Sequence, residues 1–329
     1  MSEFRPDIKP VVFSVAAESS SSNSTPALSE ISERDKPWDK HKKSADIVAG
    51  YYSTSKEFRK YSTRVNLCAD LLQFRLTPDQ YEGAYRLKLE AAKFCRVRTC
   101  PICQWRRSLR WKAKAIQILP KIVQDYPAYR WLFVTLTVKN CQIVELRETL
   151  DWINKGFKRL SELKCFPALG WIKSVEVTRG KDGSAHPHLH CLMLVRASYF
   201  KKGYLSQKRW CELWQQSLRI DYQPVLDVQA IKPHNSPTAL IPEVLKYQTK
   251  ESDLVADRDW FLELTRQLHK TRAIAVGGIF REYFRETERE VEEDLIGQSD
   301  ESDQVDEGKL YFGWKRQQKR YRMIDHGAL

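Results

Sequence analysis

Two runs rich in β-branched and apolar residues, 172–178 and 188–195, are separated by only a short polar segment. That segment contains Asp182 followed by Gly183, a pair that favours the tight turn of a β-hairpin. A hairpin joins antiparallel strands, whereas the parallel strands of a doubly wound fold need long crossover connections. We therefore expect an α+β fold with a central, mostly antiparallel sheet flanked by helices.

Hydrophobic periodicity predicts the remaining elements. Further strands or extended segments are expected at 81–93, 131–138 and 227–232. Helices are expected at 104–119, 145–163, 205–218, 240–250 and 260–268.

Composition divides the chain into four parts. Residues 1–50 form a Ser-rich tail, 51–125 a Cys-rich basic segment, 126–285 the domain that holds the hairpin, and 286–329 an acidic and then basic tail. Both tails are expected to be disordered, because polar and charged stretches bury too little apolar surface to fold.

The charge balance restricts the class of partner. The chain has 55 Lys and Arg against 42 Asp and Glu, a formal charge of +13. Such a surplus predicts a polyanionic partner, with nucleic acid the first choice. No apolar run approaches the roughly 18 residues that a membrane-spanning helix needs. We expect a cytoplasmic protein without a membrane partner, whose eight cysteines are thiols or metal ligands rather than disulfides.

A histidine motif, His186-Pro-His188-Leu-His190, leads into the second strand of the hairpin. Alternate residues of a strand share a face, so His188 and His190 point the same way. Two imidazoles so placed can bind one divalent cation, and Glu176 across the hairpin is a candidate third ligand, with His186 as an alternative. The competing interpretation is a polar strand that faces solvent.

The segment 243–250 is predicted to be helical, which puts Glu243 and Tyr247 on one face with Lys250 a turn further on. A tyrosine hydroxyl is a poor nucleophile at its usual pKa near 10, but a nearby cation favours the phenolate. The alternative is an ordinary amphipathic helix in which Glu243 pairs with Lys246.

A cysteine cluster and a basic stretch lie earlier in the chain. Cys100 and Cys103 have the spacing of a zinc knuckle, and Cys95 and Cys68 would complete four thiolate ligands, unless all four are free thiols. Trp105 and Trp111 are interleaved with cations, which suits phosphate contacts and stacking on unpaired bases better than a solvated helix face. The cations expected to bind DNA are Arg96, Arg98, Arg106, Arg107, Arg110, Lys112 and Lys114.

Taken together, these motifs resemble the HUH endonuclease superfamily in their order along the chain. The stretch 94–107, the strand 133–137, the two histidines and the segment 243–250 are most similar to the replication initiators of bacterial rolling-circle plasmids. The resemblance is to the group with one catalytic tyrosine and a glutamate four residues before it, and it covers about 65–260.

The resemblance implies a chemistry and a set of partners. Mg²⁺ or Mn²⁺ would be held by His188 and His190, and Tyr247 would nick one DNA strand, leaving a 5′-phosphotyrosine and a free 3′-OH that primes synthesis. Glu243 would position a water for the closing cleavage, and Lys250 would neutralise phosphate or stabilise the phenolate. The implied partners are plasmid origin DNA and the host helicase, DNA polymerase and single-strand-binding protein.

Three other functions compete with this one. A single-strand transposase would use the same chemistry at different DNA ends. A conjugative relaxase is disfavoured, because its tyrosine usually precedes the histidine motif. A non-catalytic zinc-knuckle DNA-binding regulator would tolerate substitution of His188, His190 and Tyr247.

Overall fold

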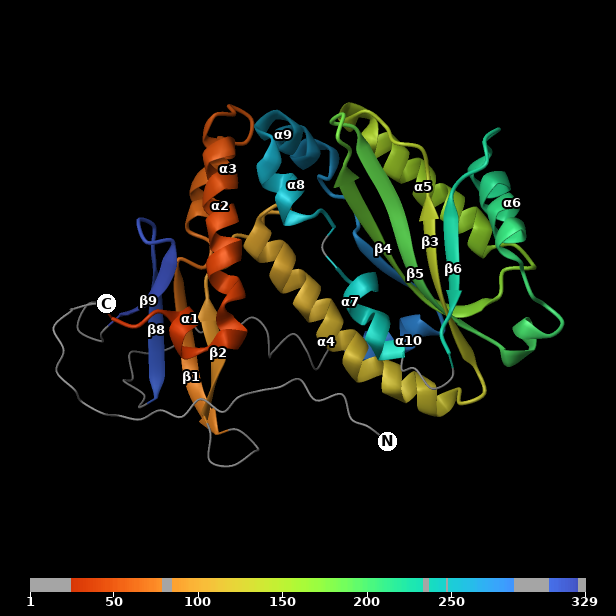
Figure 1. Cartoon of the computed structure of the whole chain (residues 1–329), viewed down its shortest axis with the longest axis horizontal. Helices are drawn as coiled ribbons and strands as arrows, with labels where there is room; N and C mark the ends of the chain where they lie inside the picture. Colours follow the sequence, from red (N-terminus) through yellow and green to blue (C-terminus); the bar gives the residue numbers. More distant parts are fainter. Residues whose placement is uncertain (1–24, 79–84, 233–236, 247, 287–307, 325–329) are drawn as a thin grey trace.

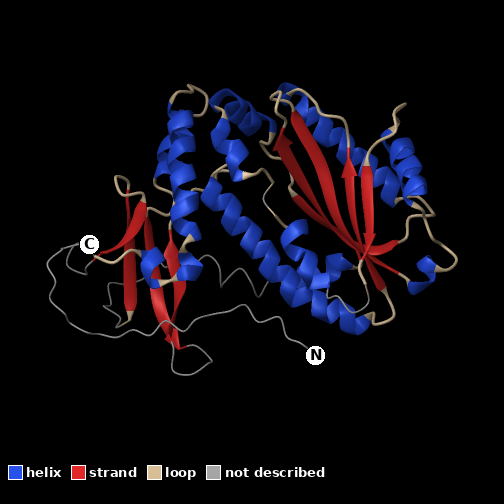
Figure 2. Ribbon diagram, viewed as in Figure 1, coloured by secondary structure: helices blue, strands red, loops and turns tan. Residues whose placement is uncertain are grey.

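The computed structural model describes residues 25–78, 85–232, 237–246, 248–286 and 308–324. They form two separate sheets joined by one long helix, α4 (Pro101–Asp125), which crosses between them (Figure 1). Every pairing of named strands is antiparallel. The predicted α+β fold with antiparallel sheets flanked by helices is confirmed, and Figure 2 shows its strands gathered in two groups. In the ranges given above, none of the helices combines the length and the apolar character needed to span a bilayer.

The larger sheet has five strands in the order β6-β3-β5-β4-β7. Its centre is the expected hairpin of β4 and β5, in which Gly183 adopts a left-handed φ of +82° and the Ser184 N–H donates to the Asp182 carboxylate. The strands are β3 (Arg130–Thr137), β4 (Ala168–Arg179), β5 (Ala185–Val195), β6 (Leu226–Ala230) and β7 (Ile274–Gly278).

Helices cover both faces of this sheet (Figure 1). One face packs on α5 (Leu146–Ser161), which also contacts α6 (Gln207–Leu218). The other face is covered by α4, α7 (Ile241–Val244) and α10 (Phe280–Glu286). Along β5, Leu192 and Leu194 join the core under α4, and His188 and His190 share their parity. The two histidines therefore lie on the α4 face.

The smaller sheet has the order β2-β1-β8-β9, so strands from both ends of the described chain meet in it. It packs with the N-terminal helices around Trp38, Phe74, Phe312 and Tyr321, which are all almost fully buried. Its elements are β1 (Leu71–Pro78), β2 (Tyr85–Ala92), β8 (Lys309–Lys315), β9 (Arg320–Ile324), α1 (Leu28–Ile31), α2 (Pro37–Ser53) and α3 (Arg59–Asn66).

The remaining helices connect the two sheets. Helix α2 packs against α8 (Glu251–Ala256) and α9 (Arg258–Gln267), where the Tyr51 hydroxyl donates to the Val255 carbonyl at 2.7 Å. Short 3-10 helices are η1 (Glu33–Asp35), η2 (Ile143–Glu145), η3 (Ala197–Phe200) and η4 (Pro237–Leu240).

The disorder predicted for the tails 1–50 and 286–329 is wrong for those of their residues that the structure describes. Residues 25–50 are mostly helical, and 309–324 contain β8 and β9. These stretches are mostly polar and charged, but a few large apolar side chains, Trp38 and Phe312 among them, are buried in the core. The apolar surface that they bury is enough to order the surrounding chain. The basic cluster near the C-terminus is likewise part of the fold, since Arg316 pairs with Asp70 and Arg320 with Glu30. The acidic residues 287–307 lie outside the described ranges.

Replacing Phe312 with alanine tests whether the C-terminal hairpin belongs to the core. Phe312 is fully buried and packs edge-on against Phe74, with ring centroids 5.8 Å apart. We expect Phe312→Ala to lower the free energy of unfolding by about 3–5 kcal/mol in urea titrations, and Lys315→Ala, an exposed residue of the same strand, to change it by less than about 0.5 kcal/mol. A loss below about 1 kcal/mol for Phe312→Ala would show that β8 contributes little to the core.

Candidate active site and cysteine cluster

The β4–β5 hairpin brings Glu176, His188 and His190 together. Glu176 pairs directly with His188 across the hairpin, and Ser174 pairs with His190. The Oε2 atom of Glu176 lies 3.0 Å from His188 Nε2 and 2.9 Å from His190 Nε2. All three side chains offer ligand atoms within 4.8 Å of one another, and Glu176 is 2% exposed. Two imidazoles and one carboxylate at this spacing suit a divalent cation.

The second nitrogen of each imidazole has a partner of its own. His190 Nδ1 lies 3.3 Å from Thr135 Oγ1, and the Phe133 ring stacks on the imidazole at 5.7 Å. His188 Nδ1 lies 3.3 Å from the carbonyl oxygen of His186. Such partners fix the ring orientation and direct Nε2 toward a metal. His186 itself, the alternative third ligand, is not part of the cluster.

Lys246 completes the polar contacts of this cluster. Its Nζ lies 2.7 Å from Glu176 Oε2 and 2.7 Å from Glu243 Oε1. Burial opposes ionisation of Glu176, but hydrogen bonds from His188, His190 and Lys246 outweigh it and hold the pKa of this carboxyl well below its usual range. Glu176 is therefore a carboxylate at neutral pH. The sequence pattern predicted Lys246 only as a partner of Glu243, although its place next to Tyr247 in the chain was a signal for a part in the site.

The predicted helix at 240–250 is wrong beyond residue 244. Helix α7 ends at Val244, and Leu245 leaves the helical region with φ −111° and ψ 32°. The chain then runs beside β4, where the Val177 N–H donates to the Gln248 carbonyl at 2.7 Å and Thr249 bridges Val177 in parallel. Hydrogen bonds to the strand replace those of the helix, so local periodicity was a poor guide here.

This correction changes the setting of the three predicted catalytic residues. Tyr247 lies outside the described residues, but both of its chain neighbours contact β4. Lys246 pairs with Glu176, and Gln248 accepts a hydrogen bond from the next residue of the strand, Val177. Glu243 lies in α7 and pairs with Lys246, and its side chain is 48% exposed. Lys250 is exposed and occupies the position before α8.

The four predicted cysteines form a second cluster. The sulfurs of Cys68, Cys95, Cys100 and Cys103 all lie within 4.8 Å of one another, and all four residues are buried. Cys103 Sγ is 3.7 Å from Cys68 Sγ and 3.6 Å from Cys95 Sγ. A tetrahedral ion with Zn–S bonds near 2.3 Å separates its sulfurs by about 3.8 Å. The cluster therefore has the donor set and the spacing of a structural zinc site.

Backbone geometry supports this cluster. The N–H of Cys95 donates to Cys68 Sγ at 3.4 Å, and that of Val97 to Cys95 Sγ at 3.5 Å, across a turn in which Arg96 has a φ of +57°. Hydrogen bonds from the other three cysteines lower the pKa of Cys103, whereas burial raises the pKa of Cys100. A bound cation would stabilise the thiolate form of all four sulfurs.

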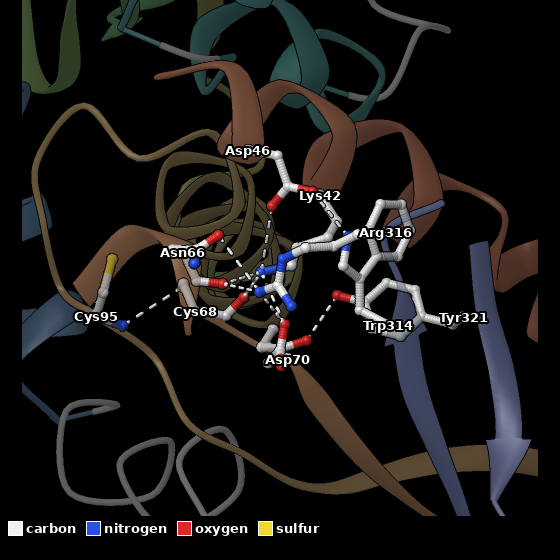
Figure 3. A network of polar contacts seen from close by, with 10 residues as sticks. Lys42, Asp46, Asn66, Cys68, Asp70, Cys95, Trp314, Arg316 and Tyr321 are labelled. Carbon is white, nitrogen blue, oxygen red and sulfur yellow. Dashed lines mark hydrogen bonds and ion pairs between the residues drawn. The ribbon is translucent and has the colours of Figure 1, made fainter. Parts of the chain in front are cut away.

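A buried lysine holds the loop that carries Cys68 (Figure 3). Lys42 has no exposed surface, and its Nζ donates to the carbonyl oxygens of Asn66 at 2.5 Å and of Cys68 at 3.1 Å. Asp46 and Asp70 lie 3.7 and 3.4 Å from the same nitrogen. The charge is thus compensated, and the backbone around Cys68 is fixed from the side of α2.

The C-terminal hairpin contacts the same network (Figure 3). The Trp314 indole donates to Asp46 at 2.7 Å, and the Tyr321 hydroxyl donates to the carbonyl of Ala69, the residue after Cys68, at 2.6 Å. Residues about 250 positions later in the chain therefore brace the cysteine loop.

The predicted DNA-binding cations are more buried than expected. Of the seven, only Arg96 is exposed, and the others are partly or fully buried along α4 and the turn before it. Arg98 donates to Gln248 at 2.7 Å, and burial lowers its pKa to about 10. Trp105 packs edge-on against Trp38 at 4.7 Å and is 8% exposed, so it is a core residue and not a base-stacking one. Arg107 borders a small hollow together with Lys246.

Comparison with known proteins agrees with the motifs. A family model described as a replication protein, Rep_1, matches residues 86–322. The chain belongs to this family. Its membership confirms the family predicted from the order of the motifs, that of the rolling-circle plasmid replication initiators. The matched region continues past residue 260 to include β8 and most of β9, consistent with their place in the fold.

Individual relatives cover most of this replication protein. A protein named Protein rep from Streptococcus pneumoniae serotype 2 (strain D39 / NCTC 7466) is 34% identical over 275 residues, 80% of this chain and 84% of the relative. Protein rep from Lactiplantibacillus plantarum is 35% identical over 284 residues, 81% of this chain and 87% of the relative. No solved structure matches.

Replacing Lys246 with glutamine tests its contact with the metal cluster. The ammonium shares Glu176 Oε2 with the two imidazoles, so it competes electrostatically with a cation there. We expect Lys246→Gln to bind Mn²⁺ about tenfold more tightly, as measured by the electron paramagnetic resonance signal of free Mn²⁺. Lys250→Gln is the matched control and should leave this affinity unchanged. Weaker Mn²⁺ binding by Lys246→Gln would contradict the competition.

Proposed function

We propose that this replication protein initiates plasmid rolling-circle replication by nicking and rejoining one DNA strand at the origin. The observation that carries the proposal is the Glu176–His188–His190 cluster, with both chain neighbours of Tyr247 in contact with the strand that bears Glu176. Family membership supports a role in replication. The cation is Mg²⁺ or Mn²⁺, whose preference for oxygen and nitrogen ligands fits this set.

The chemistry follows from the groups that the cluster assembles. A bound divalent cation would act as a Lewis acid on an oxygen of the scissile phosphate. The Tyr247 oxygen attacks the phosphorus as the bond to the 3′ oxygen breaks, which leaves a 5′-phosphotyrosine and a free 3′-OH. Because one phosphoester replaces another, no ATP is consumed. Lys246, the residue before the tyrosine, supplies positive charge that favours the phenolate.

Glu243 and Lys250 take supporting parts in this proposal. Glu243 is half exposed and is held by Lys246, so its carboxylate can position a water for the closing cleavage. Lys250 is exposed just after the tyrosine segment and would neutralise phosphate. The predicted DNA-binding cations would contact the same DNA strand, and one of them, Arg107, lines the hollow that Lys246 also lines.

The partners of this reaction are origin DNA and the replication machinery of the host. We propose that the 3′-OH is extended by the host DNA polymerase while a helicase and a single-strand-binding protein handle the displaced strand. An HUH-type transposase would give the same cleavage at different DNA sites, and a non-catalytic regulator would give none.

Substitution of Tyr247 tests the nucleophile. We expect Tyr247→Phe to bind the origin with nearly unchanged affinity and to form no covalent adduct, because only the attacking oxygen is lost. The assay incubates supercoiled plasmid that carries the DNA flanking this gene with protein and either Mn²⁺ or EDTA. It follows open circles and protein–DNA adducts on denaturing gels.

Tyr204→Phe is the matched control, since Tyr204 is an exposed tyrosine beyond the end of β5 whose ring contacts Tyr199. It should nick like the wild type. His190→Gln should lose the Mn²⁺-dependent adduct as well. Equal loss of binding and of adduct in Tyr247→Phe would make the residue structural, and tight binding without any adduct in the wild type would favour the regulator.

We also propose that the four cysteines hold a structural Zn²⁺. Their burial and sulfur spacing support a closed, four-thiolate site with no open position for substrate. Such a site would stabilise the junction between the small sheet and the N-terminus of α4, where Cys100 and Cys103 lie.

Zinc content and stability provide the test. We expect about one zinc per chain by mass spectrometry of the metals, and a loss of several kcal/mol of unfolding free energy when Zn²⁺ is removed by a chelator. Cys100→Ser should lose the zinc, whereas Cys165→Ser, which replaces an exposed thiol, should keep it. Wild-type protein without zinc and with unchanged stability in chelator would leave the cysteines as free thiols.

A further inference from the structure

A cavity of about 360 Å³ lies on the α5 face of the large sheet, opposite to the histidine cluster. Val175 and Lys173 of β4 line it, and both have the parity opposite to Glu176. Leu150 of α5 contributes another apolar wall, and residues 270–275, which lead into β7, close one side. The volume falls within the range of small-ligand sites, roughly 300–1,000 Å³.

The polar lining of this cavity is strongly cationic. Arg147, Lys173, Lys270 and Arg272 face it, whereas Asp151 is the only carboxylate among the residues that line it. Arg147 is anchored on the backbone, where its guanidinium donates to the carbonyl oxygen of His269. None of the four cations takes part in the proposed cleavage.

Lys173 is the informative member of this group. Its side chain is 6% exposed, and its Nζ donates to Asn154 Oδ1 at 2.6 Å and lies 4.5 Å from the centre of the Phe157 ring. Among the described residues, these are its polar contacts, and none is an ion pair with a carboxylate. Burial accordingly lowers its pKa to about 8. A buried ammonium without an anion is costly, and an anionic ligand would remove that cost.

We propose that this cavity binds a phosphate group, with Lys173 as its buried contact and Lys270 and Arg272 at its mouth. A phosphate suits several convergent lysines and arginines, and the protein belongs to a family that works on nucleic acid. The phosphate belongs either to a free nucleotide or to the backbone of a DNA strand. Phosphate binding here does not require the proposed nicking chemistry.

The position of the cavity connects it to the other face. It shares Val175, Ala273 and Ile274 with the hollow that Arg107 and Lys246 border. The two concavities therefore adjoin at the start of β7, beside Val175 of β4. A DNA strand that passes from the candidate nicking site around this edge of the sheet would bring its following phosphates to the cavity.

Calorimetric titration of the full chain tests the proposal. The three probes are inorganic phosphate, dATP and a six-nucleotide oligo-dT, all in EDTA so that no cleavage occurs. Lys173→Met keeps the length and apolar stem of the side chain but removes its charge. For each probe that the wild type binds, we expect this variant to bind at least tenfold more weakly. Lys158→Met, which removes an exposed charge of α5, should bind it equally well.

The doubly substituted Lys270→Gln/Arg272→Gln protein provides a second test, because both residues are exposed and their loss should not affect folding. We expect it to bind about threefold to tenfold more weakly. A Lys173-dependent response to phosphate or dATP identifies a free nucleotide site, and one confined to the oligonucleotide identifies the DNA backbone. The proposal would be overturned if the wild type bound none of the probes. It would also be overturned if neither Lys173→Met nor the double substitution weakened binding. The Tyr247→Phe nicking assay fails or succeeds independently of this result.

Discussion

The register of the β4–β5 hairpin is the constraint on which the candidate site depends. Side chains alternate across a strand, so a slip of one residue would turn His188 and His190 into the α5 core and move Leu189 and Cys191 to the α4 face. The tight turn at Gly183 and the apolar residues of both faces oppose such a slip. The same pairing that buries the core therefore sets the distance between Glu176 and the two imidazoles.

The second constraint is the return of the C-terminus to the N-terminal sheet. Strand β8 pairs with β1, and the side chains of Trp314 and Tyr321 reach the loop that holds Cys68. The cysteine cluster then connects this sheet to the first turn of α4, whose other end lies under the large sheet. The helix thus transmits the position of one sheet to the other.

Much of this arrangement follows from short-range patterns. The hairpin, the helix at 104–119 and the histidine pair depend on turn chemistry and periodicity, and all are present. The helix expected at 240–250 fails because β4 offers its backbone to Gln248 and Thr249, a competitor that no local pattern reveals. The tails and Trp105 were misjudged for a related reason, since their contacts are with residues far away in the sequence.

The interleaving of the small sheet has a consequence for how the chain folds as it is synthesised. All five strands of the large sheet, and all four cysteines of the cluster, leave the ribosome before β8 does. Until then β1 has β2 on one side and an unpaired edge on the other, with Phe74 lacking its partner Phe312. The nascent protein therefore passes through a stage in which the sheet with the histidine cluster is complete while that edge is open to incorrect pairing.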